Sequence, residues 1–596
     1  MARHADERGT APAILAPGRA PLSYAALYQR LRRAGTTLAA MGVGRGSRVA
    51  LALPDGPEAA VATVAAMSFA ACAPLPPALD ARAGASLLAQ LRIDALIVAA
   101  SHDPPIAAAA RTLGLRVIRL VADSAAPAGT FTLRAEAAGA PVQARAGDGT
   151  DVALLLQTSG TTAAAKVVPV DHAQVVFTAE LLPLRPDDRA LCVSPLFWYG
   201  PLSINVFSPL VAGASAVFTG GFDGRLFRDW LATFRPTFYG ASPTLQAAIL
   251  DVAGERRPTS LRFVRSSSRA LSPAMQQRIE ATLGVPVLQG YGMTECGLVA
   301  ANPMLPGTQR AGSVGRAQGI EIVLRDDAGR PVAPGATGEV TVRGPGVMRG
   351  YEGDPQANRE AFADGWFRTG DLGRFDADGY LYLTGRIKEI VNRGGQKISP
   401  QEVDAVFQRH PAVREAVTFP VPHPSLGEDL ATAVILHRQD GATATALRDF
   451  VMAQLVPFKV PSRVVIADGL PRNAAGKVNR AGLAAALADA LRTVFVPPRN
   501  DEEALVDEIF AEVLALEEVG AHHHFFQAGG DSLSGARVIA RLKDLAGTDV
   551  PLSALFEAPT VAQLADRLRH AATSSQALPR DDIALAPRAG VRGRPA

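Results

Sequence analysis

The chain has 596 residues, a length that predicts several domains, about four by typical domain size. Hydrophobic residues make up 48% of it and the formal net charge is only +3, a balance typical of soluble globular proteins. With so little net charge, the composition gives no support to a nucleic-acid or other polyanion partner.

The three cysteines, Cys72, Cys192 and Cys296, lie far apart and lack metal-ligand spacing. This argues against a disulfide framework and favours a reducing compartment. The charged first ten residues contain no apolar core of a secretory signal. We therefore expect a cytoplasmic protein.

From about residue 13 to residue 383, short apolar runs such as 49–53, 95–98 and 152–156 alternate with alanine-rich amphipathic segments. This alternation predicts α/β layers with largely parallel strands. The uncharged stretch 59–79 approaches the length of a membrane span. Its alanines and prolines favour a buried helix followed by a core strand, and we expect no membrane span.

Beyond residue 384 the apolar units shorten. A helix is expected at 401–409 and strands at 416–419 and 432–436, which indicates a smaller α+β domain that ends near residue 491. A proline-containing linker then leads into a compact helical module.

Within this module, the sequence Gly-Gly-Asp-Ser-Leu at 529–533 places Ser532 at the start of a helix that is expected to run to about residue 545. Such a serine is either an ordinary helix N-cap or an exposed attachment point. The three histidines at 522–524 are expected in a solvated loop rather than at a metal site.

A hydroxyl-rich loop follows the expected strand at 152–156. It combines several donors, exposed backbone amides and a lysine, which suits the negative oxygens of a polyphosphate. It lacks the Gly-Lys-Ser/Thr ending of a Walker loop, so an ordinary polar loop is the alternative. The candidate phosphate-binding residues are Thr158, Ser159, Gly160, Thr161, Thr162 and Lys166.

A second segment, 289–295, places Gly290 and Gly292 around Tyr291, so that a flat ring can approach a ligand closely. Glu295, at its end, can bind a hard cation. Taken alone, the segment is more often a tight turn after a strand.

Three further segments follow. The segment 365–371 ends in Asp371, whose carboxylate can accept hydrogen bonds from sugar hydroxyls; 385–398 straddles the expected domain boundary; and 470–477 places Lys477 on a glycine-bearing loop. Taken alone, each segment is more often a stretch of charged surface residues without a functional role.

Together and in this order, the five segments resemble those of the adenylate-forming superfamily: acyl-CoA synthetases, luciferases and the adenylation domains of non-ribosomal peptide synthetases. The resemblance covers about residues 21–491, and the stretch 525–533 similarly looks like a peptidyl or acyl carrier domain. It implies a multidomain α/β protein. The implied parts are a large α/β adenylation subdomain at 1–384, a small mobile α+β C-terminal subdomain at 385–491, a linker at 492–500, a small helical-bundle carrier domain at 501–572 and a disordered tail at 573–596.

The resemblance also implies the chemistry. A carboxylic acid reacts with ATP and Mg²⁺ to give an acyl adenylate and pyrophosphate, and a thiol then displaces AMP. That thiol would be the terminal group of a 4′-phosphopantetheine arm that is covalently attached to Ser532. By the same resemblance, Lys477 would bridge the substrate carboxylate and the α-phosphate, and Lys166, with the loop at 158–162, would hold the outer phosphates.

The remaining implied roles concern the nucleotide and the movement of the small subdomain. Tyr291 and its flanking glycines would lie against adenine, Thr294 would contact phosphate and Glu295 would bind Mg²⁺. Asp371 would take the ribose hydroxyls with Arg386 nearby, and Lys388 would be the hinge. One departure from the family pattern is alanine at positions 163 and 165, where the family usually has glycine and proline, so the loop is expected to be less mobile or differently shaped.

A second departure concerns the substrate. Relatives that activate amino acids carry an aspartate in the segment aligned with 194–203, which has no acidic residue here. A buried ammonium without a counter-charge is costly, so we expect an acid without a free α-amine. By approximate alignment, the pocket residues are Trp198, Tyr199, Gly200, Ser203, Gly240, Ser266, Gly290 and Leu298.

The leading hypothesis is an adenylation–carrier enzyme of non-ribosomal peptide or related secondary metabolism that loads its own arm. Its expected partners are a phosphopantetheinyl transferase and a condensation, ketosynthase or tailoring enzyme that acts in trans. The alternatives are a CoA ligase that releases acyl-CoA and a non-catalytic scaffold whose carrier is charged by another protein.

Overall fold

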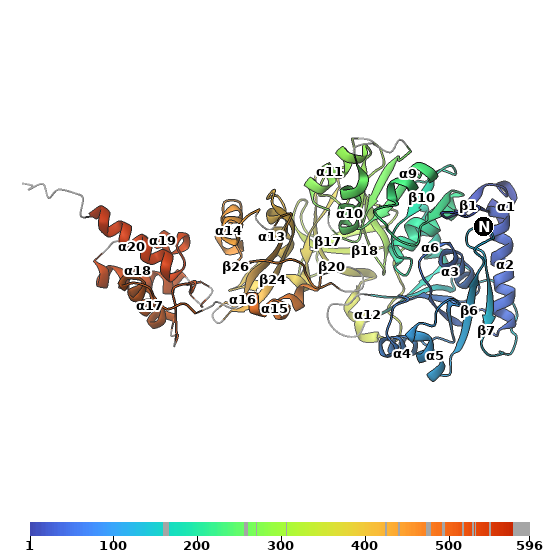
Figure 1. Cartoon of the computed structure of the whole chain (residues 1–596), viewed down its shortest axis with the longest axis horizontal. Coiled ribbons are helices and arrows are strands. Elements are labelled where there is room, and N and C mark those ends of the chain that lie inside the picture. The colour runs from blue at the N-terminus through green and yellow to red at the C-terminus, as the bar shows by residue number, and fades with distance from the viewer. Residues whose placement is uncertain are drawn as a thin grey trace, which may run out of the picture. The chain divides into compact units, whose positions relative to one another are not determined.

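The computed structural model describes residues 1–575 except 159–165, 255–259, 270, 306, 424–425, 439–440, 473–477, 492–494, 515, 517, 527, 529, 531 and 548–549. The chain divides into two compact units, Met1–Lys388 and Glu389–Ala596 (Figure 1). The first unit holds three sheets, and the second holds one sheet followed by a group of helices.

A seven-stranded sheet forms the first layer of the large unit, in the order β7-β6-β5-β3-β4-β8-β9. Its strands are β3 (Arg48–Ala52), β4 (Ala71–Pro74), β5 (Ala95–Ala99), β6 (Arg116–Ala122), β7 (Phe131–Ala135), β8 (Val152–Gln157) and β9 (Val167–Asp171). The inner strands pair in parallel, and β7 and β9 pair antiparallel at the edges. The helices α2 (Tyr24–Ala40), α3 (Pro57–Phe69), α4 (Ala81–Gln90) and α5 (Pro105–Thr112) accompany it.

The helix α3 is buried along most of its length and leads into β4, whose last three residues are buried. The expected buried helix and core strand are thus confirmed. Among the described residues, no helix is both long and apolar enough to cross a membrane.

A nine-stranded sheet, in the order β16-β15-β14-β13-β12-β10-β11-β1-β2, carries most of the candidate site. Its strands are β1 (Pro12–Leu15), β2 (Leu22–Ser23), β10 (Arg189–Cys192), β11 (Ser215–Phe218), β12 (Phe238–Ala241), β13 (Phe263–Ser266), β14 (Val287–Met293), β15 (Gly297–Ala301) and β16 (Arg316–Ala317). Six neighbouring strands of this sheet run parallel: β14, β13, β12, β10, β11 and β1.

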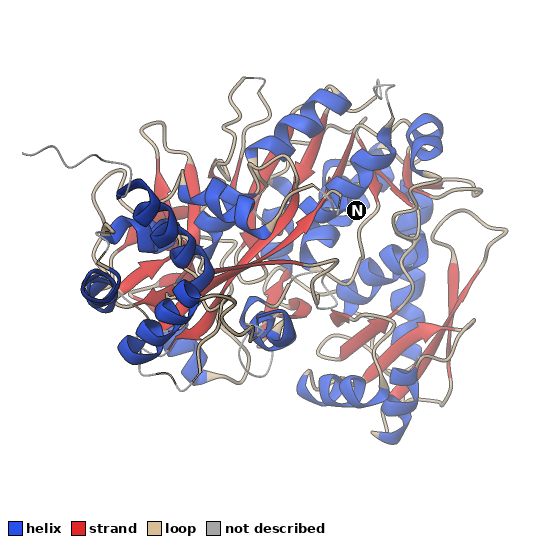
Figure 2. Cartoon of the chain, turned by 60° about the vertical axis from the view of Figure 1, so that its left-hand side comes forward, coloured by secondary structure: helices blue, strands red, loops and turns tan. Residues whose placement is uncertain are grey.

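Helices pack on both faces of this sheet (Figure 2). One face is covered by α9 (Phe227–Phe234), α10 (Pro243–Ala253) and α11 (Pro273–Leu283). The other faces the main hydrophobic core, to which α6 (His172–Glu180), α7 (Tyr199–Leu202), the π-helix η1 (Ser203–Phe207) and α8 (Ser208–Ala212) contribute. The short helix α1 (Ala2–Glu7) begins the chain.

The third sheet of the unit is antiparallel, an exception to the largely parallel pairing that the sequence predicts. It consists of β17 (Glu321–Arg325), β18 (Gly338–Arg343), β19 (Phe362–Ala363), β20 (Trp366–Phe375) and β21 (Leu381–Arg386), with α12 (Pro355–Ala361) before β19. The short connection between β20 and β21 explains their antiparallel pairing. Only residues 376–380 join the two strands, and a parallel pair needs a longer crossover connection.

The second unit begins with a small α+β fold, as expected. Its sheet contains β22 (Val391–Arg393), β23 (Gln396–Ile398), β24 (Val413–His423), β25 (Gly427–Leu436) and β26 (Arg463–Ile466). Its helices are α13 (Pro400–Phe407), α14 (Ala444–Met452), α15 (Leu483–Ala486) and α16 (Ala488–Leu491).

The last part of the chain is a helical module of α17 (Asp501–Leu514), α18 (Ser532–Ala546), α19 (Leu552–Glu557) and α20 (Val561–Ser575). Its core includes Phe510, Phe525 and Leu542. The helix α20 continues to Ser575, past the expected domain end at 572. One expectation is wrong: His524 is buried, with its pKa lowered to about 3 by burial, rather than solvated. Its neighbour Phe525 is buried in the core and Phe526 packs against that core, whereas His522 is exposed as expected.

Candidate functional site

Asp371 lies at the centre of the first polar cluster. Its Oδ2 accepts a hydrogen bond from the Tyr291 hydroxyl at 2.6 Å, and its Oδ1 accepts one from Arg386 Nε at 2.7 Å. Register pairing of β20 with β21 sets Asp371 opposite Arg386. The carboxylate is only 4% exposed, yet it retains lone pairs that can accept further hydroxyl donors.

The pKa of Tyr291 is raised well above its ordinary range, first by burial and then by the charge of Asp371. The tyrosine therefore keeps its proton and acts as a hydrogen-bond donor to Asp371. Gly292, the next residue, allows the hairpin of β14 and β15 to close, because a Cβ there would lie 2.3 Å from the carbonyl oxygen of Gly297.

Glu295 forms a second cluster with Tyr351 and Lys166. The Tyr351 hydroxyl donates to Glu295 Oε1 at 3.0 Å, and Lys166 Nζ lies 4.5 Å from the centre of the Tyr351 ring. Burial raises the pKa of Glu295, while the positive charge of Arg386 opposes that shift. Arg386, which pairs with Asp371, thus also acts on the charge of Glu295.

A divalent cation at Glu295 would have few protein ligands, since no group of three acidic, histidine or cysteine side chains suited to a metal occurs among the described residues. One carboxylate is compatible with Mg²⁺, which commonly binds to one or two carboxylates together with substrate phosphates and water. Glu295 therefore fits a cation that arrives with a polyphosphate.

The expected phosphate loop joins β8 to β9. The backbone N–H of Thr158 donates to the carbonyl of Lys166 at 3.1 Å, so the two ends of the loop are held together. The intervening Ser159, Gly160, Thr161 and Thr162, and the two unusual alanines, lie outside the described residues.

The expected pocket residues come from three neighbouring regions. Trp198 and Tyr199 lie at the start of α7, Ser203 begins η1, and Gly240, Ser266 and Gly290 lie on the adjacent strands β12, β13 and β14. Gly200 is in α7 and Leu298 in β15. Burial raises the pKa of Tyr199 to about 12, so its hydroxyl stays protonated at neutral pH.

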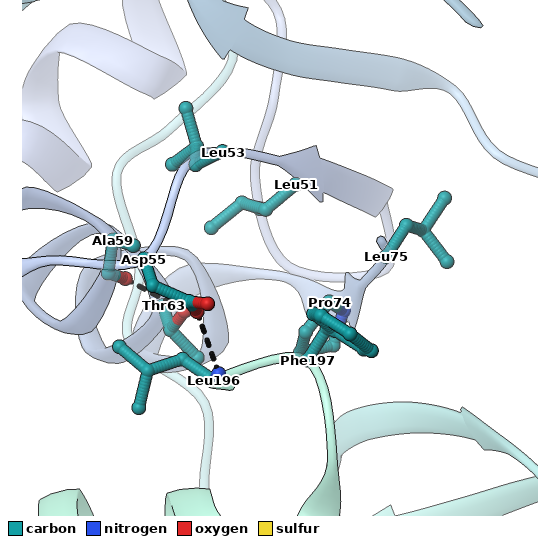
Figure 3. A pocket seen from close by; sticks show the side chains of 9 residues that line it. All are labelled: Leu51, Leu53, Asp55, Ala59, Thr63, Pro74, Leu75, Leu196 and Phe197. Carbon is teal, nitrogen blue, oxygen red and sulfur yellow. Dashed lines mark hydrogen bonds between the residues drawn. The ribbon is translucent and has the colours of Figure 1, made fainter. Parts of the chain in front are cut away.

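The segment before α7 is anchored by a residue that the sequence did not single out. Asp55 Oδ1 accepts a hydrogen bond from the backbone N–H of Leu196 at 2.7 Å. Figure 3 shows this bond at the edge of a small pocket that Leu51, Pro74 and Phe197 also line. Asp55 thereby fixes the entry to the candidate substrate segment.

Arg265 on β13 is a second residue that sequence reasoning missed. It is 3% exposed and lies between Val264 and Ser266, both buried. A charged residue inside an apolar strand was the available signal. From sequence alone, however, such an arginine is easily taken for an exposed residue of an otherwise buried strand.

Three further expected residues are Lys388, Lys477 and Ser532. Lys388 lies in a short 3₁₀ helix, η2 (Ile387–Glu389), at the last position of the first unit. Lys477 lies outside the described residues. Ser532 is the first residue of α18, as expected, although its side chain is not among those described.

Comparison with known protein families identifies three matching segments. Residues 1–352 match the model of the AMP-binding enzyme family, and residues 402–477 match the AMP-binding enzyme C-terminal domain. Residues 504–568 match the phosphopantetheine attachment site.

Comparisons with individual proteins give the same family. The chain is 36% identical to oxalate–CoA ligase of Arabidopsis thaliana, covering 78% of this chain and 94% of that protein. It is 34% identical to sulfoacetate–CoA ligase of Cupriavidus necator, covering 79% and 93%. Among solved structures, ATP-bound MatB from Rhodopseudomonas palustris matches with a TM-score of 0.74 and 28% identity, covering 82% of this chain and 99% of that one.

Proposed function

The chain belongs to the family of AMP-binding enzymes, adenylate-forming acid–thiol ligases, and we propose that it activates a carboxylic acid without an α-amine and loads it onto its own carrier domain. The observation that carries this proposal is the presence, in one chain, of the two polar clusters around Asp371 and Glu295 and of a phosphopantetheine attachment domain whose helix α18 starts at Ser532.

In the first reaction, a carboxylate oxygen of the acid attacks the α-phosphorus of ATP. The new bond joins oxygen to phosphorus, and the bond to pyrophosphate breaks. Asp371 would accept hydrogen bonds from the ribose hydroxyls. Tyr291 would lie along the adenine, together with its neighbours Gly290 and Gly292. Arg386, whose Nε donates to Asp371 Oδ1 at 2.7 Å, orients that carboxylate.

The phosphates would meet Thr158, the hydroxyl loop that follows it, Lys166 and Thr294. Mg²⁺ at Glu295 would neutralise the charge that the phosphates carry. Lys477 would bridge the substrate carboxylate and the α-phosphate, where a fixed positive charge stabilises the crowded oxygens of the displacement.

In the second reaction, the acyl carbon is attacked by sulfur and its bond to the AMP oxygen breaks. The phosphopantetheine arm on Ser532 would supply the thiol. Lys388, at the boundary between the two compact units, would be the hinge that exchanges the adenylation arrangement for the thiol-transfer arrangement.

The absence of an acidic residue from 194–203 supports an acid without an α-amine. Tyr199 stands where the aspartate of amino-acid-activating relatives is expected, and its buried, protonated hydroxyl provides no charge for an ammonium group. The two relatives named above act on oxalate and sulfoacetate, acids that have no amine.

A second candidate function is release of free acyl-CoA. The names of both relatives favour it, since each is a CoA ligase. The carrier domain favours loading in cis, followed by transfer of the acyl group to a condensation, ketosynthase or tailoring enzyme in trans. A phosphopantetheinyl transferase is required to install the arm.

Intact-protein mass spectrometry tests the proposal. The holo protein is incubated with ATP, Mg²⁺ and a panel of acids, with and without CoA. We expect an acyl mass on the carrier domain that is absent from Ser532→Ala, and no mass from any standard α-amino acid. Formation of acyl-CoA with no acyl mass on the holo carrier would establish the second candidate instead.

A further inference from the structure

Arg265 is a buried cation that has no anionic partner among the described residues. Its side chain lies near the carboxyl end of β13, its residue is 3% exposed, and its Nε is buried with no hydrogen-bond partner. No ion pair or hydrogen bond joins its guanidinium to any residue that the structure describes. Burial lowers its pKa to about 10, so the side chain still carries its charge at neutral pH.

Other arginines of the same sheet region have partners. Arg262, three residues earlier, forms an ion pair with Asp188. Arg189 at the start of β10 donates to the carbonyl of Phe234 at 2.6 Å and to Ser215 Oγ at 3.3 Å. A buried charge that lacks such partners is costly, so its retention points to a partner from outside the chain.

One glycine makes room for the Arg265 side chain, and a second glycine, on the adjacent strand, makes room for Ile204. A Cβ on Gly290 of β14 would lie 2.1 Å from Arg265 Nη2 and 2.7 Å from its Cζ, so any larger residue there would displace the guanidinium. Gly240, opposite Arg265 on β12, faces Ile204 of the π-helix η1, and a Cβ there would lie 2.9 Å from Ile204 Cγ2.

This position is inside the candidate substrate site. Ile204 follows Ser203, and Gly290 immediately precedes Tyr291, which contacts Asp371. In parallel α/β sheets, ligands bind beyond the carboxyl ends of the strands, which is where Arg265 lies. A π-helix such as η1 also frequently marks a functional site.

We propose that Arg265 binds a second anionic group of the substrate, so that the activated acid is a short dianion with a carboxylate or sulfonate at its far end. The inference rests on the proposed function and names its substrate class. A short acid fits best, because the Arg265 guanidinium lies beside Gly290, the residue that precedes Tyr291, and Tyr291 contacts Asp371 of the expected nucleotide site.

The test compares acids that differ only in the far group. Pyrophosphate release by the holo protein is measured as kcat/KM for malonate against malonamate and for succinate against succinamate, each with ATP and Mg²⁺. Removing one partner of a buried charge pair leaves the other unpaired, so we expect the better of the two diacids to exceed its amide by about a hundredfold.

Arg265→Met should abolish this preference and leave the amide as good as the diacid or better. Gly290→Ala, which crowds the guanidinium, should weaken the preference in the same direction. The matched control is Arg189→Met, which removes a half-buried arginine at the opposite end of the parallel strands and should leave the preference intact, even if it lowers the melting temperature.

Equal or better use of the amides by the wild-type protein would overturn the inference and leave the proposed function standing. A diacid preference that survives in Arg265→Met would also overturn it. If Arg265→Met does not fold, the wild-type comparison and Gly290→Ala decide. No pyrophosphate release with any acid of a wider panel would overturn the proposed function itself.

Discussion

Asp371 joins three parts of the large unit, because its carboxylate contacts Tyr291 of β14 and Arg386 of β21 from its own position on β20. A neutral amide in its place would lose the charge that orders Arg386 and one of the oxygen acceptors for ribose. Hydrogen bonds to a charged group contribute about 1.5–3 kcal/mol.

Asp371→Asn should therefore raise the KM for ATP by about 10- to 100-fold, with a smaller effect on the KM for the acid. Initial rates of pyrophosphate release at varied ATP measure it. Glu321→Gln is the control, since it removes an exposed carboxylate that pairs with Arg343. An unchanged KM for ATP would show that Asp371 does not bind the nucleotide.

Glu295 gives a prediction about pH. Burial raises its pKa above the ordinary 4.5, so the folded protein bears the cost of a poorly solvated carboxylate at neutral pH. The cost is absent at a pH below the unfolded value, where the group is protonated in both states, and it appears as the pH rises through the folded pKa.

Glu295→Gln should accordingly raise the melting temperature of the ligand-free protein at about pH 7, and this gain should disappear near pH 4. The same variant should lose activity if Glu295 holds Mg²⁺. Thermal unfolding across this pH range measures the first effect. Glu321→Gln should give a small change of opposite sign, since Arg343 lowers the pKa of Glu321.

At the scale of elements, the main strands and helices follow from their apolar patterns. The expected runs at 49–53, 95–98 and 152–156 correspond to β3, β5 and β8, and the helix at Ser532 corresponds to α18. The antiparallel sheet β17–β21 was not foreseen, because local periodicity does not report which strands pair.

The candidate site was foreseen through its motifs rather than through its contacts. Tyr291 is far from Asp371 in the chain, and only the folded sheets show that they touch, whereas Arg386 was expected near Asp371 and pairs with it. Asp55 and Arg265 escaped sequence reasoning for a related reason. Each has its informative contact with a residue elsewhere in the sequence: Asp55 accepts a hydrogen bond from Leu196, and Arg265 packs against Gly290.

The segment between β10 and α7 depends on Asp55 for its position. Asp55→Ala should free the backbone N–H of Leu196 and loosen residues 194–203, which raises the KM for the acid several-fold more than the KM for ATP. Steady-state kinetics with each substrate varied in turn measures the difference. Asp80→Ala removes the N-cap of α4 and is the control, since it should lower stability without changing either KM.

For the whole molecule, the position of Lys388 at the boundary between the two compact units is the relevant feature. Proline at 388 restricts φ and disfavours the α region of Ile387, so it should hinder rotation about this point. Lys388→Pro should keep pyrophosphate exchange within a few-fold of wild type and slow acyl transfer to the carrier by at least about tenfold.

Single-turnover loading followed by intact mass separates the two steps. Lys388→Ala, which leaves the backbone free, should load at nearly the wild-type rate. Equal losses of exchange and loading in Lys388→Pro would show a general loss of structure, and no loss in either would remove Lys388 as the hinge.

The packing of Arg265 against Gly290 has a consequence for how this protein can vary over time. An alanine at 290 would clash mainly with the guanidinium of Arg265, since its Cβ would lie 2.1 Å from Arg265 Nη2 but 3.3 Å from the carbonyl oxygen of Ala300. The residues that position 290 can accept therefore depend on the residue at position 265. A lineage that adopts a new cargo would pass through the loss of the arginine first, and only afterwards would position 290 be free to gain a side chain.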